Sequence, residues 1–204
     1  MREEVREGYE NADYEGLYRD GREIRSEEKD LFQDLFDYIG DSAQILDLGC
    51  GTGLPFDQYL IENGYDLIGI DIAEKHVEKA RENIPEAEII QGDFFEADVA
   101  NSSLDAVVSF YAIFHIPREE HRKLFEQINN WLKPEGYILV TVASTEMEDL
   151  KESWNGAEIK WSSFEGSKTL EIIEKSGFEI VRTYEEDWRD EDHLWVLARK
   201  IKSN

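Results

Sequence analysis

Three glycines, Gly49, Gly51 and Gly53, stand between a short apolar segment and a longer amphipathic one. The apolar segment, 44–48, has the length of a strand, and Pro55 stands where a helix would begin. Glycine allows positive φ and a close approach of the backbone to a ligand, and the helix that follows presents unpaired N–H groups. A strand, a glycine turn and a helix in this order predict an α/β fold with a cofactor site at the turn.

The same alternation of short apolar and longer amphipathic segments continues along the chain. It predicts parallel strands joined by helices. We expect strands at 44–48, 66–70, 88–91, 104–110, 137–143, 179–183 and 193–198, and helices at 26–39, 55–62, 73–84, from 117 onward, and at 168–175. Because no helix separates the last two strands, we expect them to pair in antiparallel fashion.

Carboxylates follow the second and third strands. Asp71 ends the second strand at the position where such folds place a carboxylate for both ribose hydroxyls. Asp93 and Phe94 follow the third strand, where a carboxylate can accept the exocyclic amine of adenine and an aromatic ring can cover the base. The dinucleotide fingerprint asks for a further glycine where this chain has Leu54, so these strand ends favour an adenosine site without a nicotinamide half.

Together these segments resemble class I S-adenosylmethionine-dependent methyltransferases. The resemblance rests on 45–53, Asp71, 92–94, 104–117 and 132–136, and is close over about residues 43–143. It implies a Rossmann-like three-layer sandwich over 1–204, with a seven-stranded, mostly parallel sheet of order 3-2-1-4-5-7-6, an antiparallel last strand, and S-adenosylmethionine as the cofactor.

The resemblance also assigns roles to individual residues. Backbone around Gly49 would hold the methionine part of the cofactor, Asp71 the ribose, and Asp93 with Phe94 the adenine. The expected cofactor-binding residues are Asp47, Gly49, Gly51, Gly53, Asp71, Ile72, Asp93, Phe94 and Phe110. The alternative is that the glycines make only a tight turn and the aspartates cap helices.

One candidate catalytic residue and one cysteine lie near these segments. His115 follows the fourth strand, where it could take a proton from an incoming nucleophile, or could instead fix the loop before Pro117. Cys50 lies inside the glycine turn, where a small residue is expected to pack rather than react.

Two segments outside the resemblance carry clustered aromatic residues. An acidic arm over 1–25 contains Tyr9, Tyr14 and Tyr18 and either closes over the cofactor or is tethered to the surface. Its spacing gives no clean helical face, which favours tethering. The segment 144–166, with Trp154, Trp161 and Phe164, is either a substrate cap or a satellite of the core.

The composition argues against several classes of partner. The formal net charge is −25, from 47 acidic and 22 basic side chains. Such a surface repels nucleic-acid phosphates and anionic lipid headgroups, although plain solubility or salt adaptation also explains it. No run approaches the ~18 apolar residues of a membrane helix, and the first residues lack a signal-peptide pattern, so we expect a cytoplasmic protein.

The motifs that are missing narrow the expected reaction. Methyltransferases of this family that modify amino groups of nucleic-acid bases carry an Asn-Pro-Pro-Tyr type motif after the fourth strand. Residues 109–112 of this chain are Ser-Phe-Tyr-Ala instead. The segment after the fourth strand lacks the carboxylate cluster that would indicate a metal site. The sequence also has no cysteine outside the glycine turn that could act as a nucleophile. We therefore expect metal-independent methyl transfer to an unidentified small molecule. The alternatives are an NAD-dependent oxidoreductase and a non-catalytic S-adenosylmethionine-binding module.

Overall fold

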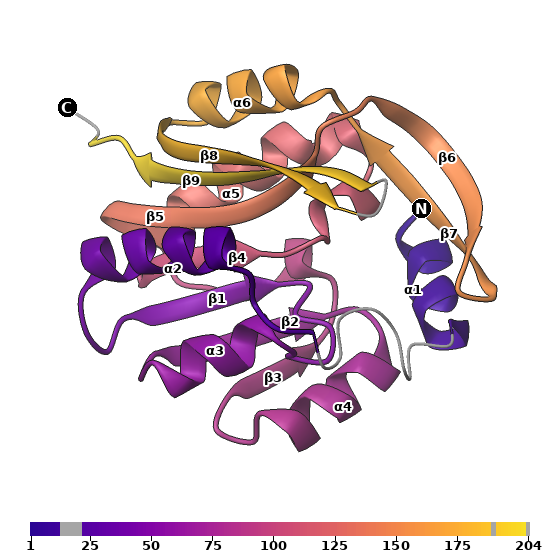
Figure 1. The fold of residues 1–204 in the computed structure, drawn as a ribbon, viewed down its shortest axis with the longest axis horizontal. Coiled ribbons are helices and arrows are strands. Elements are labelled where there is room, and N and C mark those ends of the chain that lie inside the picture. The colour runs from indigo at the N-terminus through magenta and orange to yellow at the C-terminus, as the bar shows by residue number, and fades with distance from the viewer. Residues whose placement is uncertain (13–21, 189–190, 203–204) are drawn as a thin grey trace.

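The computed structural model describes residues 1–12, 22–188 and 191–202. Its main sheet has seven strands in the order β3-β2-β1-β4-β5-β9-β8 (Figure 1). These strands are β1 (Gln44–Leu48), β2 (Asp66–Asp71), β3 (Glu88–Gln91), β4 (Leu104–Ser109), β5 (Leu132–Ala143), β8 (Phe178–Trp188) and β9 (Glu191–Lys200). Strands β1 to β5 are parallel, and β9 is antiparallel to both of its neighbours. Counted within this sheet alone, the order is the predicted 3-2-1-4-5-7-6.

Helices cover both faces of the sheet, because the buried strands alternate apolar side chains between the two faces. In β1, Ile45 packs in one core cluster and Leu46 in the other. The first cluster includes side chains of α2 (Ser26–Ile39), α3 (Phe56–Glu62) and α4 (Glu74–Asn83); the second includes α5 (His121–Trp131) and α6 (Gly166–Lys175). The three-layer arrangement expected from the sequence is confirmed.

Short 3₁₀ helices follow two of the strands. They are η1 (Phe94–Glu96) after β3, and η2 (Ile113–His115) and η3 (Arg118–Glu120) after β4. The helix predicted to open at Pro117 is therefore divided into η3 and α5, and β5 begins at Leu132 instead of residue 137. These differences affect only the boundaries of the predicted elements.

Two elements outside the main sheet were not predicted. A helix, α1 (Arg2–Asn11), lies beside a hairpin of β6 (Met147–Trp154) and β7 (Ala157–Ser163) (Figure 1). The prediction that the spacing of the three tyrosines of the arm gives no clean helical face stays a prediction. Val5 and Gly8 are buried on α1, and Gly8 lies so close to the hairpin that a Cβ there would be 2.7 Å from the Glu158 carbonyl oxygen. Tyr14 and Tyr18 lie outside the described residues.

The strand order of the sheet reverses direction between β1 and β4. From β1 the chain runs outward to β2 and β3 on one side, and from β4 to β5 on the other. The turns after β1 and β4 meet there: Gly49 has φ +84°, and a Cβ on it would overlap the Cβ of Ala112. Ligands of open α/β sheets bind at such a switch point, at the carboxyl ends of the strands.

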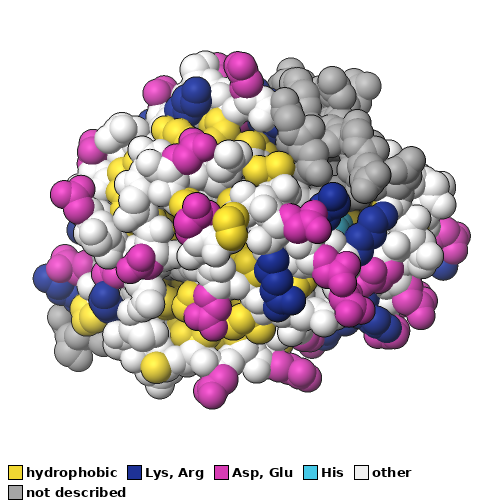
Figure 2. Space-filling view, turned by 90° about the horizontal axis from the view of Figure 1, so that it is seen from below, with side chains coloured by type: hydrophobic (Ala, Val, Ile, Leu, Met, Phe, Trp, Pro, Cys, Tyr) yellow, Lys and Arg dark blue, Asp and Glu magenta, His cyan; other side chains and the backbone are white. Residues whose placement is uncertain are grey.

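One face of the molecule carries its acidic side chains in a dispersed pattern. On the described part of the face drawn in Figure 2, Asp and Glu side chains are scattered, with Lys and Arg side chains between them. This dispersion fits a general surface property better than one docking patch on this face. Among the described helices, none has the length and apolar character needed to cross a membrane.

Candidate functional site

A cavity of about 390 Å³ opens at the carboxyl ends of β1 to β4. The residues predicted as cofactor-binding or catalytic all line it, and they are Asp47, Gly49, Gly51, Gly53, Asp71, Ile72, Asp93, Phe94, Phe110 and His115. Trp154 and Trp161 of the hairpin line it as well. Phe164 does not, because it packs under the guanidinium of Arg118, 5.2 Å from its ring centroid.

Asp71, at the end of β2, holds the glycine turn and the start of α4. One of its oxygens accepts the backbone N–H of Gly51 at 2.9 Å, and the other accepts that of Ala73 at 2.9 Å. His76 Nδ1 lies 3.4 Å from the same carboxylate. Burial opposes the charged form, but the positive charge of His76 and these donors outweigh it and hold the pKa of Asp71 below its ordinary value. Asp71 is therefore ionised at neutral pH.

Two further carboxyls lie buried beside the turn. Oδ1 of Asp47 and both oxygens of Asp57 accept no hydrogen bond from an N–H or hydroxyl donor among the described residues, and the two carboxyls interact with each other. Burial, followed by the charge of Asp57, raises the pKa of Asp47 well above its ordinary value, and burial raises the pKa of Asp57 to about 7. These oxygens, together with Asp71, make this end of the cavity suited to a positively charged ligand.

Cys50 contributes packing rather than reactivity. Its side chain is buried, and burial together with the nearby carboxylates raises the pKa of its thiol well above 9. A thiol protonated at neutral pH is a poor nucleophile. The expectation that Cys50 packs in the turn agrees with this environment.

Asp93 and Phe94 line the cavity at the end of β3. Asp93 caps η1 by accepting the N–H of Phe95 at 2.9 Å, and its other oxygen lies 2.5 Å from Nε of Arg2. Arg2 also pairs with Glu120. An ion pair thus joins α1 to the edge of the cavity where the sequence predicted an adenine site.

Phe110, one of the expected cofactor-binding residues, lies mostly in the core. Its side chain is only 6% exposed, and its ring lies 4.5 Å from that of Phe56 in the core. Phe110 still lines the cavity. Much of its side chain therefore serves the packing of α3 on the sheet.

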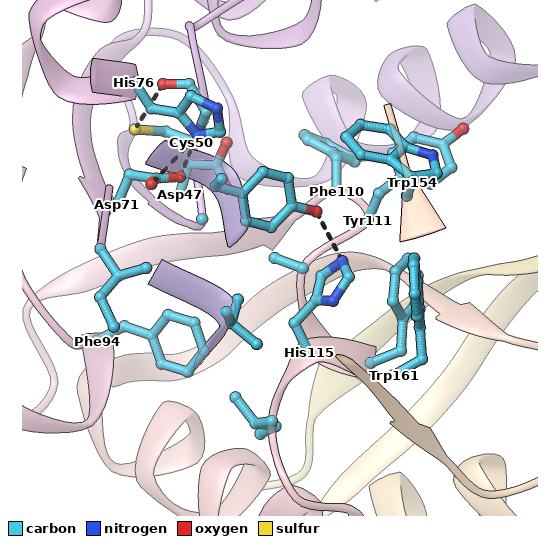
Figure 3. Close-up of a pocket in the computed structure, with 18 of the residues that line it drawn as sticks. Asp47, Cys50, Asp71, His76, Phe94, Phe110, Tyr111, His115, Trp154 and Trp161 are labelled. Atoms are coloured by element: carbon cyan, nitrogen blue, oxygen red, sulfur yellow. Dashed lines mark hydrogen bonds and ion pairs between the residues drawn. The ribbon is translucent and has the colours of Figure 1, made fainter. Parts of the chain in front are cut away.

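His115 is held on both sides of its ring. Its Nδ1 lies 2.8 Å from the carbonyl oxygen of Lys160 on β7, and its Nε2 lies 2.8 Å from the hydroxyl of Tyr9 on α1, the dashed line at His115 in Figure 3. Because a carbonyl only accepts, Nδ1 carries the hydrogen and Nε2 presents a lone pair to the tyrosine hydroxyl. His115 can therefore fix the loop through Nδ1 and accept a proton at Nε2.

The cavity has two chemically different ends. In the view of Figure 3, one side carries Asp47, Cys50, Asp71 and His76, and the other carries Phe110, Tyr111, His115, Trp154 and Trp161. The first end is acidic and lined by backbone of the glycine turn. The second is aromatic and includes the proton-accepting nitrogen of His115.

Three residues of the site escaped the sequence analysis. His76 lies in the first turn of α4, and Asp57 lies in the first turn of α3. Because each of these helices follows a strand of the sheet, their first turns could have suggested both residues as parts of the site. Tyr111 follows β4 with φ +60°, and its hydroxyl donates to the buried Glu186 at 2.8 Å. Nothing in the spacing of Glu186, 75 positions further on, indicates that partnership.

Known proteins match this chain in sequence and in fold. Residues 45–136 match the model of a family described as a methyltransferase domain. An uncharacterized methyltransferase of Oceanobacillus iheyensis is 25% identical over 93% of this chain and 88% of its own length. The phosphoethanolamine N-methyltransferase of Plasmodium falciparum is 30% identical over 57% of this chain, which spans 44% of that protein.

A solved structure agrees with this match. The crystal structure of a putative S-adenosylmethionine-dependent methyltransferase from Listeria monocytogenes superposes with a TM-score of 0.73. It is 18% identical and covers 85% of this chain and 96% of its own. At this identity the likeness concerns the fold.

Proposed function

Because this chain is an S-adenosylmethionine-dependent methyltransferase with the class I fold, we propose that it methylates a small molecule bound in the cavity beside the glycine turn. The observation that carries the proposal is that one cavity has an acidic, glycine-lined end and an aromatic end that contains His115. A volume of about 390 Å³ lies in the range of small-molecule sites. The Plasmodium relative, named for phosphoethanolamine, also acts on a small acceptor.

The acidic end fits the cofactor. Gly49 and Gly51 line the cavity there, and the buried carboxyls of Asp47 and Asp57 suit a cationic group. We assign Asp71 and Ile72 to the ribose side, and Asp93 with Phe94 to the adenine. When bound, the cofactor would supply a methyl group on a sulfonium. The acceptor takes this methyl group in an in-line displacement, and the sulfur leaves as a thioether.

At the aromatic end, His115 receives the proton that the acceptor loses. Its Nδ1–H is held by the Lys160 carbonyl, so Nε2 is the accepting atom, and the Tyr9 hydroxyl beside it carries the proton across. Alignment of the acceptor in a cavity that excludes water provides the larger share of the rate. The reaction proposed here uses no metal ion.

Helix α1 closes the cavity in this proposal. Arg2, Val5 and Tyr9 line it, and α1 is fixed to α4 by Glu10, whose carboxylate accepts the N–H of Glu74 at 2.5 Å. We propose that α1 opens to admit ligands and shields the reaction when closed. One domain over 1–204, a cytoplasmic location, and the exclusion of nucleic acid and membrane partners stay predictions from the sequence.

Two measurements test the proposal. Calorimetry should find binding of S-adenosylmethionine and S-adenosylhomocysteine and weaker or no binding of NAD and NADP. Turnover of labelled S-adenosylmethionine against a metabolite panel, read as S-adenosylhomocysteine formation, should then identify an acceptor. Tighter binding of NAD than of either sulfur cofactor would overturn the cofactor assignment, and turnover only on a macromolecule would overturn the small-molecule assignment.

A further inference from the structure

The hairpin β6–β7 presents one face to the cavity. In its register Leu150 pairs with Trp161 and Trp154 with Ala157, so these side chains share that face, with Glu152 between them on β6. Leu150, Glu152, Trp154 and Trp161 all line the cavity. Each strand of the hairpin therefore contributes one indole, and β6 adds one carboxylate, to the wall opposite the sheet.

These indoles lie with Tyr9 and His115 in one group of rings. The Tyr9 ring is 6.0 Å from that of Trp154 and 5.3 Å from that of His115, and Trp161 is 5.7 Å from His115. The contacts are tilted or edge-on, so these rings do not lie in one plane. A cationic group placed beside them can lie within ~6 Å of more than one ring, the range of a cation–π interaction.

The charges that line the cavity also favour a cation. Among the lining residues that the structure describes, Arg2 is the only Lys or Arg, and it pairs with Asp93 and Glu120. The acidic lining residues are Asp47, Asp57, Asp71, Asp93, Glu152 and Asp192. Within the described chain, Glu152 has no ion pair. A phosphate or carboxylate on the acceptor would find no available guanidinium or ammonium partner in this lining.

From this arrangement we infer that the acceptor is a small amine without an anionic group, and that Tyr9, Trp154 and Trp161 hold its nitrogen. The inference rests on the proposed function. In the transfer, the nitrogen lone pair forms the new N–C bond, the S–C bond breaks with its electrons returning to sulfur, and the proton of the nitrogen passes to Nε2 of His115. Until that proton leaves, the positive charge lost by sulfur lies on the nitrogen, where the rings stabilise it.

A pair of probes separates charge from shape. Choline and 3,3-dimethyl-1-butanol have the same shape and differ in carrying a quaternary nitrogen or a neutral carbon. We expect calorimetry in the presence of S-adenosylhomocysteine to find choline bound about ten-fold or more tightly than the alcohol. Trp154→Leu and Trp161→Leu should each reduce this ratio several-fold, and Trp161→Phe should reduce it less than Trp161→Leu. Tyr38→Leu, which removes a half-exposed ring outside the cavity, should leave the ratio unchanged.

The outcomes separate this inference from the proposed function. If S-adenosylhomocysteine binds but the two probes bind equally, or the indole variants keep the ratio in a folded protein, the amine inference is wrong while the methyltransferase site stands. Turnover that is confined to hydroxyl, thiol or carboxylate acceptors would also overturn the amine inference alone. If S-adenosylhomocysteine itself fails to bind, the proposed cofactor site fails, and the amine inference fails with it.

Discussion

Tyr9 and His115 stand 106 positions apart in the chain, and in the structure the tyrosine hydroxyl lies 2.8 Å from His115 Nε2. The ring of Tyr9 also lies 5.1 Å from that of His76, the neighbour of Asp71. One side chain of α1 therefore touches both the acidic and the aromatic end of the cavity. Closure of α1 and the arrangement of the proposed proton acceptor are consequently coupled through Tyr9.

The first prediction concerns His115. If the acceptor is a hydroxyl or another weakly acidic group, His115→Ala should lower turnover by roughly 10²–10⁴-fold while cofactor affinity is retained, because the variant removes the atom that accepts the proton. If the acceptor is an unprotonated amine, alignment suffices and the loss should stay below about ten-fold. The measurement is steady-state kinetics with an identified acceptor across pH, with calorimetry of S-adenosylhomocysteine alongside. His115→Gln is the matched variant, since its amide can still donate to the Lys160 carbonyl. If glutamine restores near-normal turnover with an unchanged pH profile, His115 only fixes the loop.

A second prediction isolates the hydroxyl of Tyr9. Tyr9→Phe keeps the ring contacts with His76, His115 and Trp154 and removes the hydroxyl that is bonded to Nε2. For an acceptor that must lose a proton during attack, we expect turnover to fall by at least about ten-fold, with little change in thermal stability, because the proton then lacks its carrier. For an unprotonated amine the fall should be smaller. Unchanged turnover in Tyr9→Phe would limit Tyr9 to a packing role in the closed position of α1.

Asp71→Ala should weaken cofactor binding by about 1.5–3 kcal/mol, the usual contribution of hydrogen bonds to a charged group. The structure adds a cost in stability, because the carboxylate also holds the backbone of Gly51 and Ala73. We therefore expect a lower melting temperature as well as weaker binding, measured by calorimetry on the folded variant. Asp66→Ala, at the exposed start of the same strand, provides the control for loss of one charge. Unchanged affinity at Asp71→Ala would show that the ribose binds elsewhere.

The sequence predicts the part of the cavity that is built from residues directly after the strands. The glycine turn, Asp71, Asp93 and Phe94 each follow a strand, and parallel strands bring their carboxyl ends to one edge, so spacing alone places them together. Tyr9, by contrast, reaches the cavity through α1, whose buried face consists of Val5 and Gly8 and so carries only one large apolar side chain. A helix that docks through a glycine and a tyrosine is not detectable from hydrophobic spacing.

The hairpin escaped prediction for a related reason. The side chains of β6 are mostly exposed or half-buried, so the strand lacks the apolar run that identifies the strands of the main sheet. Trp154 and Trp161 were recognised as aromatic residues, but which of them face the cavity depends on the register of the hairpin. Asp57 and Glu186 act through partners distant in the chain, which one sequence does not specify.

A substitution in the glycine turn tests the close packing at the switch point. Gly49→Ala places a Cβ against Ala112 at positive φ, and we expect a loss of about 2–4 kcal/mol in the free energy of unfolding together with weaker cofactor binding. Gly64→Ala is the matched control, because Gly64 has φ +88° with open space around its Cα. The control should lose only about 1–2 kcal/mol from backbone strain. Equal losses in denaturant unfolding would show that Ala112 accommodates the added methyl group.

The buried carboxyl of Asp57 gives the ligand-free protein an unusual dependence of stability on pH. Burial raises the pKa of Asp57 to about 7, whereas in the unfolded chain it titrates near the ordinary value of 3.8. Between these two values the folded state keeps a proton that the unfolded state has lost. The contribution of Asp57 is therefore fully present below pH ~4 and is lost as the pH rises through about 7.

Asp57→Asn should remove this loss, because the amide has the size of the carboxyl but never ionises. We expect the variant to gain stability over the native chain at pH 8, on the order of 1 kcal/mol or more, and to differ little from it near pH 4. Urea unfolding of both proteins from pH 4 to 9, without cofactor, measures the difference, and exposed Asp66→Asn controls for net charge. The same variant should bind S-adenosylmethionine less tightly above pH 7, since it lacks the carboxylate that faces the cationic ligand. A stability difference that stays constant with pH would mean that Asp57 keeps an ordinary pKa in the folded protein.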